Sequence, residues 1–166
     1  MNQAMVAPTL PEPQAAAEPL SPVARRIRDA VSSSEAYRRF SDEDLHAMYG
    51  TATSYMAGGR FDKAVSILIV CCMYRPHQPK YLVALGVCHR RLQQYEMAVR
   101  VFSLATSMDP MHYDAALQTA ECLLRLRRPD EARQVLKNLV ECGNLVKEAS
   151  FFGARAKVLL EFMVPE

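Results

Sequence analysis

Small and bulky apolar residues recur along this chain at a fixed spacing of thirty-four residues. Alanine recurs at Ala64, Ala98 and Ala132, and the same step relates Leu68, Phe102 and Leu136. A period of this length is typical of tandem helical hairpins, in which each unit buries its apolar face only by stacking on its neighbours. The spacing therefore predicts an all-α fold that presents an extended surface for binding.

Three repeats fit the period, at residues 45–78, 79–112 and 113–146. A second small position recurs within them, occupied by Ala52, Gly86 and Ala120. A larger side chain there would force the paired helices apart in a close-packed interior. This pattern, most complete in the middle repeat, is similar to the tetratricopeptide repeat, in which each repeat is a helix-turn-helix unit of a superhelix.

The segments on either side of the repeats have different characters. Residues 1–21 carry four prolines among alanines and no apolar periodicity, so we expect a disordered tail. Residues 22–40 are expected to hold a short N-terminal helix. Ser41, followed by three acidic residues, is a helix N-cap that opens a repeat domain over residues 41–166. Residues 147–163 have apolar residues at helical spacing and are predicted to form a C-terminal capping helix.

Composition and targeting signals favour a cytoplasmic protein. The chain has no basic segment followed by an apolar one at its start, and its longest apolar stretch, 65–74, is far shorter than the roughly 20 residues that cross a bilayer. Five cysteines form an odd set without a CxxC pair, which favours free thiols in a reducing compartment. We therefore expect no membrane insertion.

The sequence offers no set of residues for catalysis or cofactor binding. No cysteine or histidine spacing matches a zinc site, no HExxH motif is present, and no phosphate-binding GxxxxGK[ST] loop occurs. We therefore predict that the protein is not an enzyme and holds no metal and no cofactor. The formal charge of +2 is too small for a nucleic-acid-binding domain. Clustered arginines are interpreted as solvated helix ends or, alternatively, as recognition of an acidic partner segment.

The first helix of each repeat is expected to line a concave groove. Its inward positions give an apolar strip with charges at its edges, and the strip is predicted to be vacant for a partner or, alternatively, covered by the N-terminal segment or a second copy. The predicted groove residues are Tyr49, Thr53, Met56, Lys80, Val83, Val87, Arg90, Leu117, Glu121 and Leu124. Repeat proteins that clamp an acidic C-terminal peptide need lysine and asparagine at the fifth and ninth positions of the repeats. Neither residue type stands at those positions here.

Three strings carry a more specific resemblance. They are LHAMYGTATSYMAGGRFDKAV at 45–65, YLVALGVCHRRLQQYEMAVRVFSLATSMDP at 81–110, and AECLLRLRRPDEA at 120–132. Over residues 41–146 the chain resembles the class II translocator chaperones of bacterial type III secretion systems.

The resemblance implies a bacterial cytoplasmic chaperone that holds hydrophobic translocator proteins through an extended segment in the groove, so that they stay soluble and competent for export. It also implies a possible homodimer, here through Val23, Ile27 and Val31, and a transcriptional regulator as a further partner. Two alternatives stay open: a regulatory scaffold that binds a transcriptional activator, and a chaperone for needle subunits.

Overall fold

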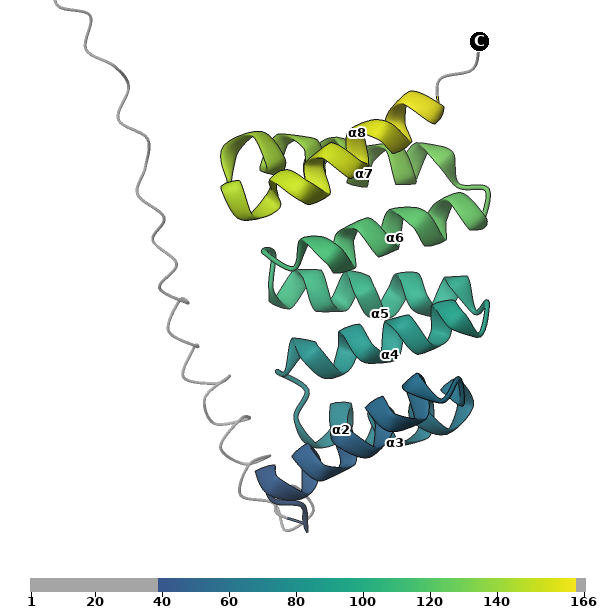
Figure 1. Cartoon of the computed structure of the whole chain (residues 1–166), viewed down its shortest axis with the longest axis vertical. Helices are drawn as coiled ribbons and strands as arrows, with labels where there is room; N and C mark the ends of the chain where they lie inside the picture. Colours follow the sequence, from purple (N-terminus) through teal and green to yellow (C-terminus); the bar gives the residue numbers. More distant parts are fainter. Residues whose placement is uncertain (1–38, 164–166) are drawn as a thin grey trace, which may run out of the picture. The chain divides into compact units, whose positions relative to one another are not determined.

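The computed structural model describes residues 39–163, and within that range the chain forms seven α-helices and one short 3₁₀ helix (Figure 1). The helices are α2 (Asp42–Ala57), α3 (Phe61–Tyr74), α4 (Pro79–Arg91), α5 (Tyr95–Met108), α6 (Tyr113–Arg125), α7 (Pro129–Leu145), η2 (Lys147–Ala149) and α8 (Ser150–Phe162). The expected tail at 1–21, the expected helix over 22–38 and the dimer residues Val23, Ile27 and Val31 lie outside the described residues.

The described helices stack in chain order from α2 to α8 (Figure 1). Each helix packs against the next, so that α2 with α3, α4 with α5, and α6 with α7 form three consecutive hairpins. The predicted all-α fold of tetratricopeptide-type helical hairpins is confirmed. Helix α8 packs mainly against α7 and also touches α6, which is where the first helix of a further repeat would lie.

Helix starts follow from local sequence signals. Ser41 caps α2: its Oγ accepts a hydrogen bond from the Asp44 amide at 3.1 Å, while its own amide donates to the Asp44 carboxylate at 2.9 Å. This reciprocal capping satisfies amides that the first helical turn leaves unpaired. The Ser41 hydrogen bonds lower the pKa of Asp44. Pro79 and Pro129 stand in the first turns of α4 and α7, where a missing amide proton costs nothing.

The turn inside each hairpin has the same backbone conformation in all three repeats. Gly59, Gln93 and Arg127 are thirty-four residues apart and have φ angles of 72°, 60° and 57°. In each turn the following residue donates its amide to a carbonyl five residues back, as Gln94 does to His89 at 2.9 Å. This is the left-handed ending of a helix that glycine adopts without strain. Only the first repeat places glycine there.

The recurring small residues lie at the tightest crossings in the stack. Ala52, Ala64, Ala98, Ala120 and Ala132 are all fully buried. In the second hairpin a Cβ built on Gly86 would lie only 2.6 Å from a ring carbon of Phe102, which is itself fully buried. The first and third hairpins place alanine opposite leucine, whereas the second places glycine opposite phenylalanine. The summed side-chain volume of the two facing positions is thus similar in all three hairpins, although it is divided differently between them.

Helices α7 and α8 cross by direct backbone contact. A Cβ added to Gly143 would lie 2.8 Å from the Cα of Gly153, and one added to Gly153 would lie equally close to the Cα of Gly143. The crossing therefore leaves no room for a Cβ at either glycine, and a larger residue would push α8 away from the third hairpin. This close approach fixes the side chains that α8 directs toward α6.

Candidate functional site

The first helices bring most of the predicted groove residues to a partly exposed surface. Five apolar residues, which we call the apolar strip, are half-buried: Tyr49 and Met56 on α2, Val83 and Val87 on α4, and Leu124 on α6. Side chains in this state keep apolar area in contact with water while their inner atoms pack on the core. The strip therefore offers a row of anchoring points along α2, α4 and α6.

Leu117 does not belong to the strip, and its prediction as an open groove residue was wrong. It is only 3% exposed and packs in a core cluster with Tyr113, Leu136, Ala149 and Ala156. The capping helix predicted at residues 147–163 was not expected to cover the groove. Helix α8 and the 3₁₀ turn before it supply the missing cover, since Ala149 and Ala156 come from them.

The α2 end of the strip is aromatic with one cation. The ring centroids of Tyr49 and Tyr81 are 5.4 Å apart, and the Lys80 ammonium lies 5.8 Å from the Tyr49 centroid and 5.0 Å from the Tyr81 centroid. Thr53 donates its hydroxyl proton to the Gly50 carbonyl at 2.8 Å, so this donor is already used within the helix. This end of the strip offers mainly ring surface.

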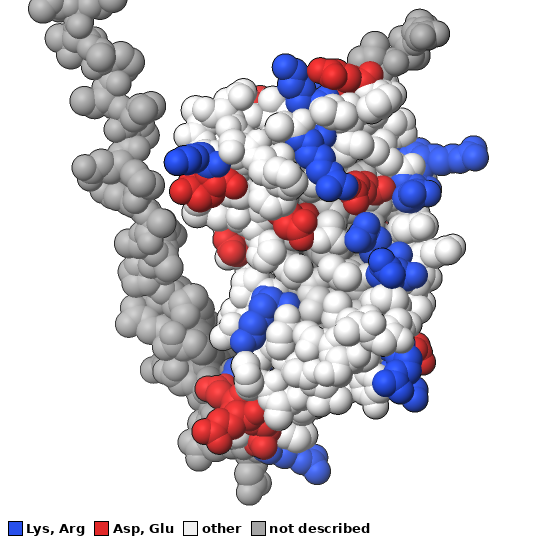
Figure 2. All heavy atoms as spheres, in the orientation of Figure 1, with Lys and Arg blue, Asp and Glu red and all other residues white. Residues whose placement is uncertain are grey.

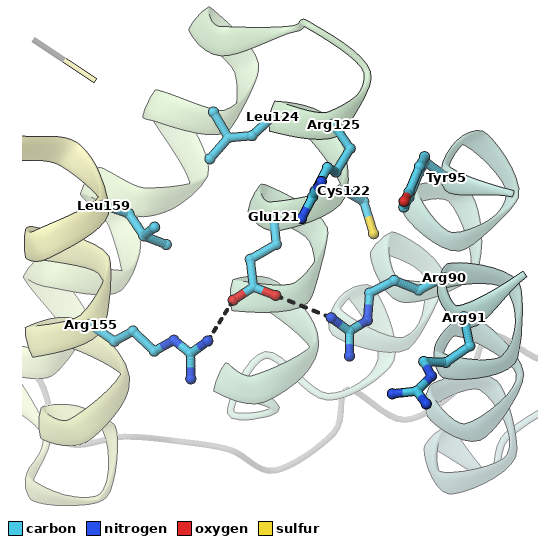
Figure 3. A pocket seen from close by; sticks show the side chains of 9 residues that line it. All are labelled: Arg90, Arg91, Tyr95, Glu121, Cys122, Leu124, Arg125, Arg155 and Leu159. Atoms are coloured by element: carbon cyan, nitrogen blue, oxygen red, sulfur yellow. Dashed lines mark hydrogen bonds and ion pairs between the residues drawn. The ribbon is translucent and has the colours of Figure 1, made fainter. Parts of the chain in front are cut away.

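The other end of the strip opens into a pocket of about 500 Å³ (Figure 3). We call it the arginine pocket. Helices α4, α6 and α8, together with Tyr95 of α5, supply its lining, which consists of Arg90, Arg91, Tyr95, Glu121, Cys122, Leu124, Arg125, Arg155 and Leu159. Three of the predicted groove residues meet here, namely Arg90, Glu121 and Leu124.

Glu121 lies between two guanidinium groups at the centre of the arginine pocket (Figure 3). Arg155 donates to one of its carboxylate oxygens at 2.9 Å and Arg90 to the other at 3.3 Å. These pairs link α6 to both α4 and α8. Arg90 lies in the last turn of α4, as expected for a helix-end arginine, and in addition converges with Arg155 on a shared carboxylate.

The cysteines and His89 lie in or against the core, whereas His46 and His77 are exposed. All five cysteines are free, and burial raises the pKa of Cys88 and of Cys122 to about 11, so both thiols are protonated at neutral pH. In the arginine pocket, Arg90 opposes this rise for Cys122 and Glu121 adds to it. His89 is buried, and its Nδ1 lies 2.7 Å from the amide oxygen of Gln94, to which it donates. Among residues 39–163 no three His, Cys, Asp or Glu side chains are placed to share a metal ion.

Fold and surface together define a class. The chain is a helical-repeat protein of the tetratricopeptide type, and its first helices present an apolar strip that ends in a charged pocket. A family model for the tetratricopeptide repeat matches residues 46–71, and one for anaphase-promoting complex, cyclosome, subunit 3 matches residues 68–139. No helix in the described part of the chain has the length and hydropathy to span a membrane.

Comparison with known proteins confirms the resemblance to translocator chaperones that the sequence shows. It is 26% identical over 145 residues to the chaperone protein SicA of Salmonella typhimurium, covering 84% of each chain. The crystal structure of PcrH in complex with the chaperone binding region of PopD superposes with a TM-score of 0.70 at 26% identity, over 75% of this chain and 94% of that one. A type III secretion complex from Aeromonas hydrophila shares the fold, with a TM-score of 0.74 at 22% identity over 86% and 95% of the two chains.

Sequence reasoning missed the contribution of α8 to the arginine pocket, although the signal was present. Extending the period by one more step relates Glu121 to Arg155 and Arg125 to Leu159. These are the ninth and thirteenth positions of the repeat, which face the groove in the first helices. Treating residues 147–163 only as a cap hid two of the pocket residues.

Proposed function

We propose that this protein is a cytoplasmic chaperone of a bacterial type III secretion system that binds hydrophobic translocator proteins. An extended segment of the client lies along the apolar strip, and the chaperone keeps the client soluble and competent for export. The protein acts by binding alone, without catalysis. The observation that carries the proposal is the row of half-buried apolar side chains on α2, α4 and α6, in a chain similar to PcrH, which was crystallised with the chaperone binding region of PopD.

The strip accounts for a binding strength suited to a holding protein. Each apolar anchor buried on the strip contributes roughly 1.5–3 kcal/mol. Three or four anchors, less the cost of ordering the client, give about 8 kcal/mol, which corresponds to a dissociation constant near 1 μM. A complex of this strength protects an aggregation-prone segment and still releases it without a nucleotide-driven step.

Co-expression with the translocators of its own secretion system tests the proposal. The wild-type protein should bring an otherwise insoluble translocator into the soluble fraction and co-purify with it. Leu124→Gln should reduce the co-purified translocator at least fivefold, because it places an amide at the α6 end of the apolar strip, where a client anchor would pack. The matched control is Leu104→Gln, which makes the same change at a side chain 51% exposed on α5.

The outcomes separate the proposed function from its alternatives. Equal recovery of the translocator with both variants would contradict binding at the strip. Recovery of needle subunits or of a transcriptional activator, with no effect on translocator solubility, would favour the needle chaperone or the regulatory scaffold instead. Circular dichroism and thermal melting of each variant show that a lost interaction is not lost folding.

A further inference from the structure

The arginine pocket carries more positive charge than its own carboxylate balances. Four arginines and one glutamate line it, so the formal charge of the lining is four minus one, or +3. Glu121 pairs with Arg90 and Arg155, whereas Arg91 and Arg125 make no ion pair with any described residue. Figure 2 shows Lys and Arg side chains over the α6 to α8 part of the stack and a second, mainly acidic group at the α2 end, with a broad uncharged area between them. The excess charge is thus local to one end of the binding surface.

Hydrogen-bond donors in the pocket are also left unused. The Nε of Arg90 is buried and has no hydrogen-bond partner within the described chain. Among the described residues its guanidinium contacts only the Glu121 carboxylate, at 3.3 Å, although a guanidinium presents five donors in a fork that matches a carboxylate. A buried donor without a partner costs free energy that an incoming acceptor recovers. The pocket therefore has both the charge and the donors to receive another carboxylate.

The remaining walls of the pocket are apolar. Leu124 and Leu159 face it from α6 and α8, and Tyr95 contributes from α5 (Figure 3). Apolar walls around a cluster of guanidiniums suit an acid carried on a short aliphatic stem, as in aspartate or glutamate. They also lower the local polarity, which strengthens a charged hydrogen bond relative to one in water.

The pocket continues the strip, because Leu124 belongs to both. We propose that the arginine pocket is a subsite for an acidic side chain of the same extended polypeptide that occupies the apolar strip. The inference rests on the proposed function and specifies the client segment: aliphatic anchors and, at the α6–α8 end, an aspartate or glutamate. Glu121 orders Arg90 and Arg155, and Arg91 and Arg125 supply the charge that the ligand neutralises.

Peptide selection provides the first test. A phage-displayed library of random twelve-residue peptides is selected on the full-length protein and, in parallel, on the double variant Arg125→Gln/Arg155→Gln. Wild type should select peptides with aliphatic anchors and an acidic residue at a fixed distance from them. The double variant should keep the aliphatic pattern and lose the acidic preference. Arg100→Gln removes one exposed charge from α5, outside the pocket, and should select like wild type.

A binding cycle provides the second test. The best selected peptide and its Glu→Gln or Asp→Asn counterpart are labelled with a fluorophore, and their dissociation constants are measured by fluorescence anisotropy. On wild type and on Arg100→Gln, neutralising the peptide should weaken binding about tenfold or more, within the coupling expected of a desolvated charge pair. On the double variant the same change should alter the dissociation constant less than twofold.

Each contrary result has a distinct meaning. Aliphatic peptides without a positioned acid would overturn the acidic subsite and leave the proposed function standing. An acidic preference that Arg100→Gln weakens as much as the double variant would also overturn the subsite, because it would reflect only the overall charge. Failure to select any aliphatic pattern would contradict the proposed function itself.

Discussion

The contact between Gly86 and Phe102 gives the sharpest quantitative prediction about the fold. In Gly86→Ala the new Cβ would meet three ring carbons of Phe102 at 2.6, 2.7 and 2.9 Å, well inside an ordinary carbon–carbon contact of 3.5–4.0 Å. Relieving such overpacking costs about 1–3 kcal/mol. Alanine recovers about 1 kcal/mol through its higher helix propensity. We therefore expect Gly86→Ala to lower the free energy of unfolding by about 1 kcal/mol.

Phe102→Leu changes the sign of that effect. Alone, it removes part of a fully buried ring and should cost about 1–2 kcal/mol, between a methylene deletion and truncation to alanine. In its presence the Cβ of alanine at position 86 has room, so Gly86→Ala should stabilise by about 1 kcal/mol. The double variant reproduces the alanine–leucine pairing of Ala52 with Leu68 in the first hairpin.

Guanidinium unfolding followed by circular dichroism measures all four proteins of this cycle. The predicted coupling between the two positions is about 2 kcal/mol, within the range seen for residues in direct contact. If Gly86→Ala changes stability equally in both backgrounds, so that the coupling is near zero, the reasoning about a shared volume between α4 and α5 is refuted.

Three further predictions concern other parts of the stack. Gly153→Ala should lower the free energy of unfolding by about 1–2 kcal/mol in guanidinium titrations, because its Cβ would strike the backbone of α7, and an unchanged midpoint would contradict the close crossing. Gly59→Ala should destabilise by about 1 kcal/mol because φ is 72°, whereas Gly50→Ala, with open space around it, should stabilise by a similar amount; thermal melts of both distinguish strain from propensity. Burial raises the pKa of Cys88 and Cys122 to about 11, so both thiols should resist alkylation at pH 8 until the protein unfolds. Their contribution to the free energy of unfolding should be complete below pH 9 and lost as pH rises toward 11. Labelling of both thiols in the folded protein at the rate of the denatured chain would contradict this.

The repeat period was enough to predict the hairpins because it reports a contact that every repeat makes. Wherever two helices cross closely, only a small residue fits, so Ala64, Ala98 and Ala132 mark the same crossing three times. Such positions can be recognised in the sequence because the limit on side-chain size arises within a single hairpin. The left-handed turn conformation at Gln93 and Arg127 could not be predicted from the sequence, because neither residue type usually adopts it.

The site was harder to predict because it depends on how the last helix packs. Whether Leu117 is open or buried is decided by α8, and nothing in the sequence around Leu117 reports that cover. The same helix supplies Arg155 and Leu159 to the arginine pocket. Sequence alone gave the charges at the edge of the groove, but their convergence on Glu121 requires the relative positions of three helices.

The central claim is that a foreign polypeptide occupies the apolar strip formed by the first helices. Methyl-labelled nuclear magnetic resonance spectra of the protein, alone and in the complex co-purified with its translocator, test it most directly. The account predicts large shifts for the methyl groups of Val83, Val87 and Leu124, with those of Ile69 and Leu104 on α3 and α5 unchanged. Shifts confined to Ile69 and Leu104, with the strip unperturbed, would contradict it.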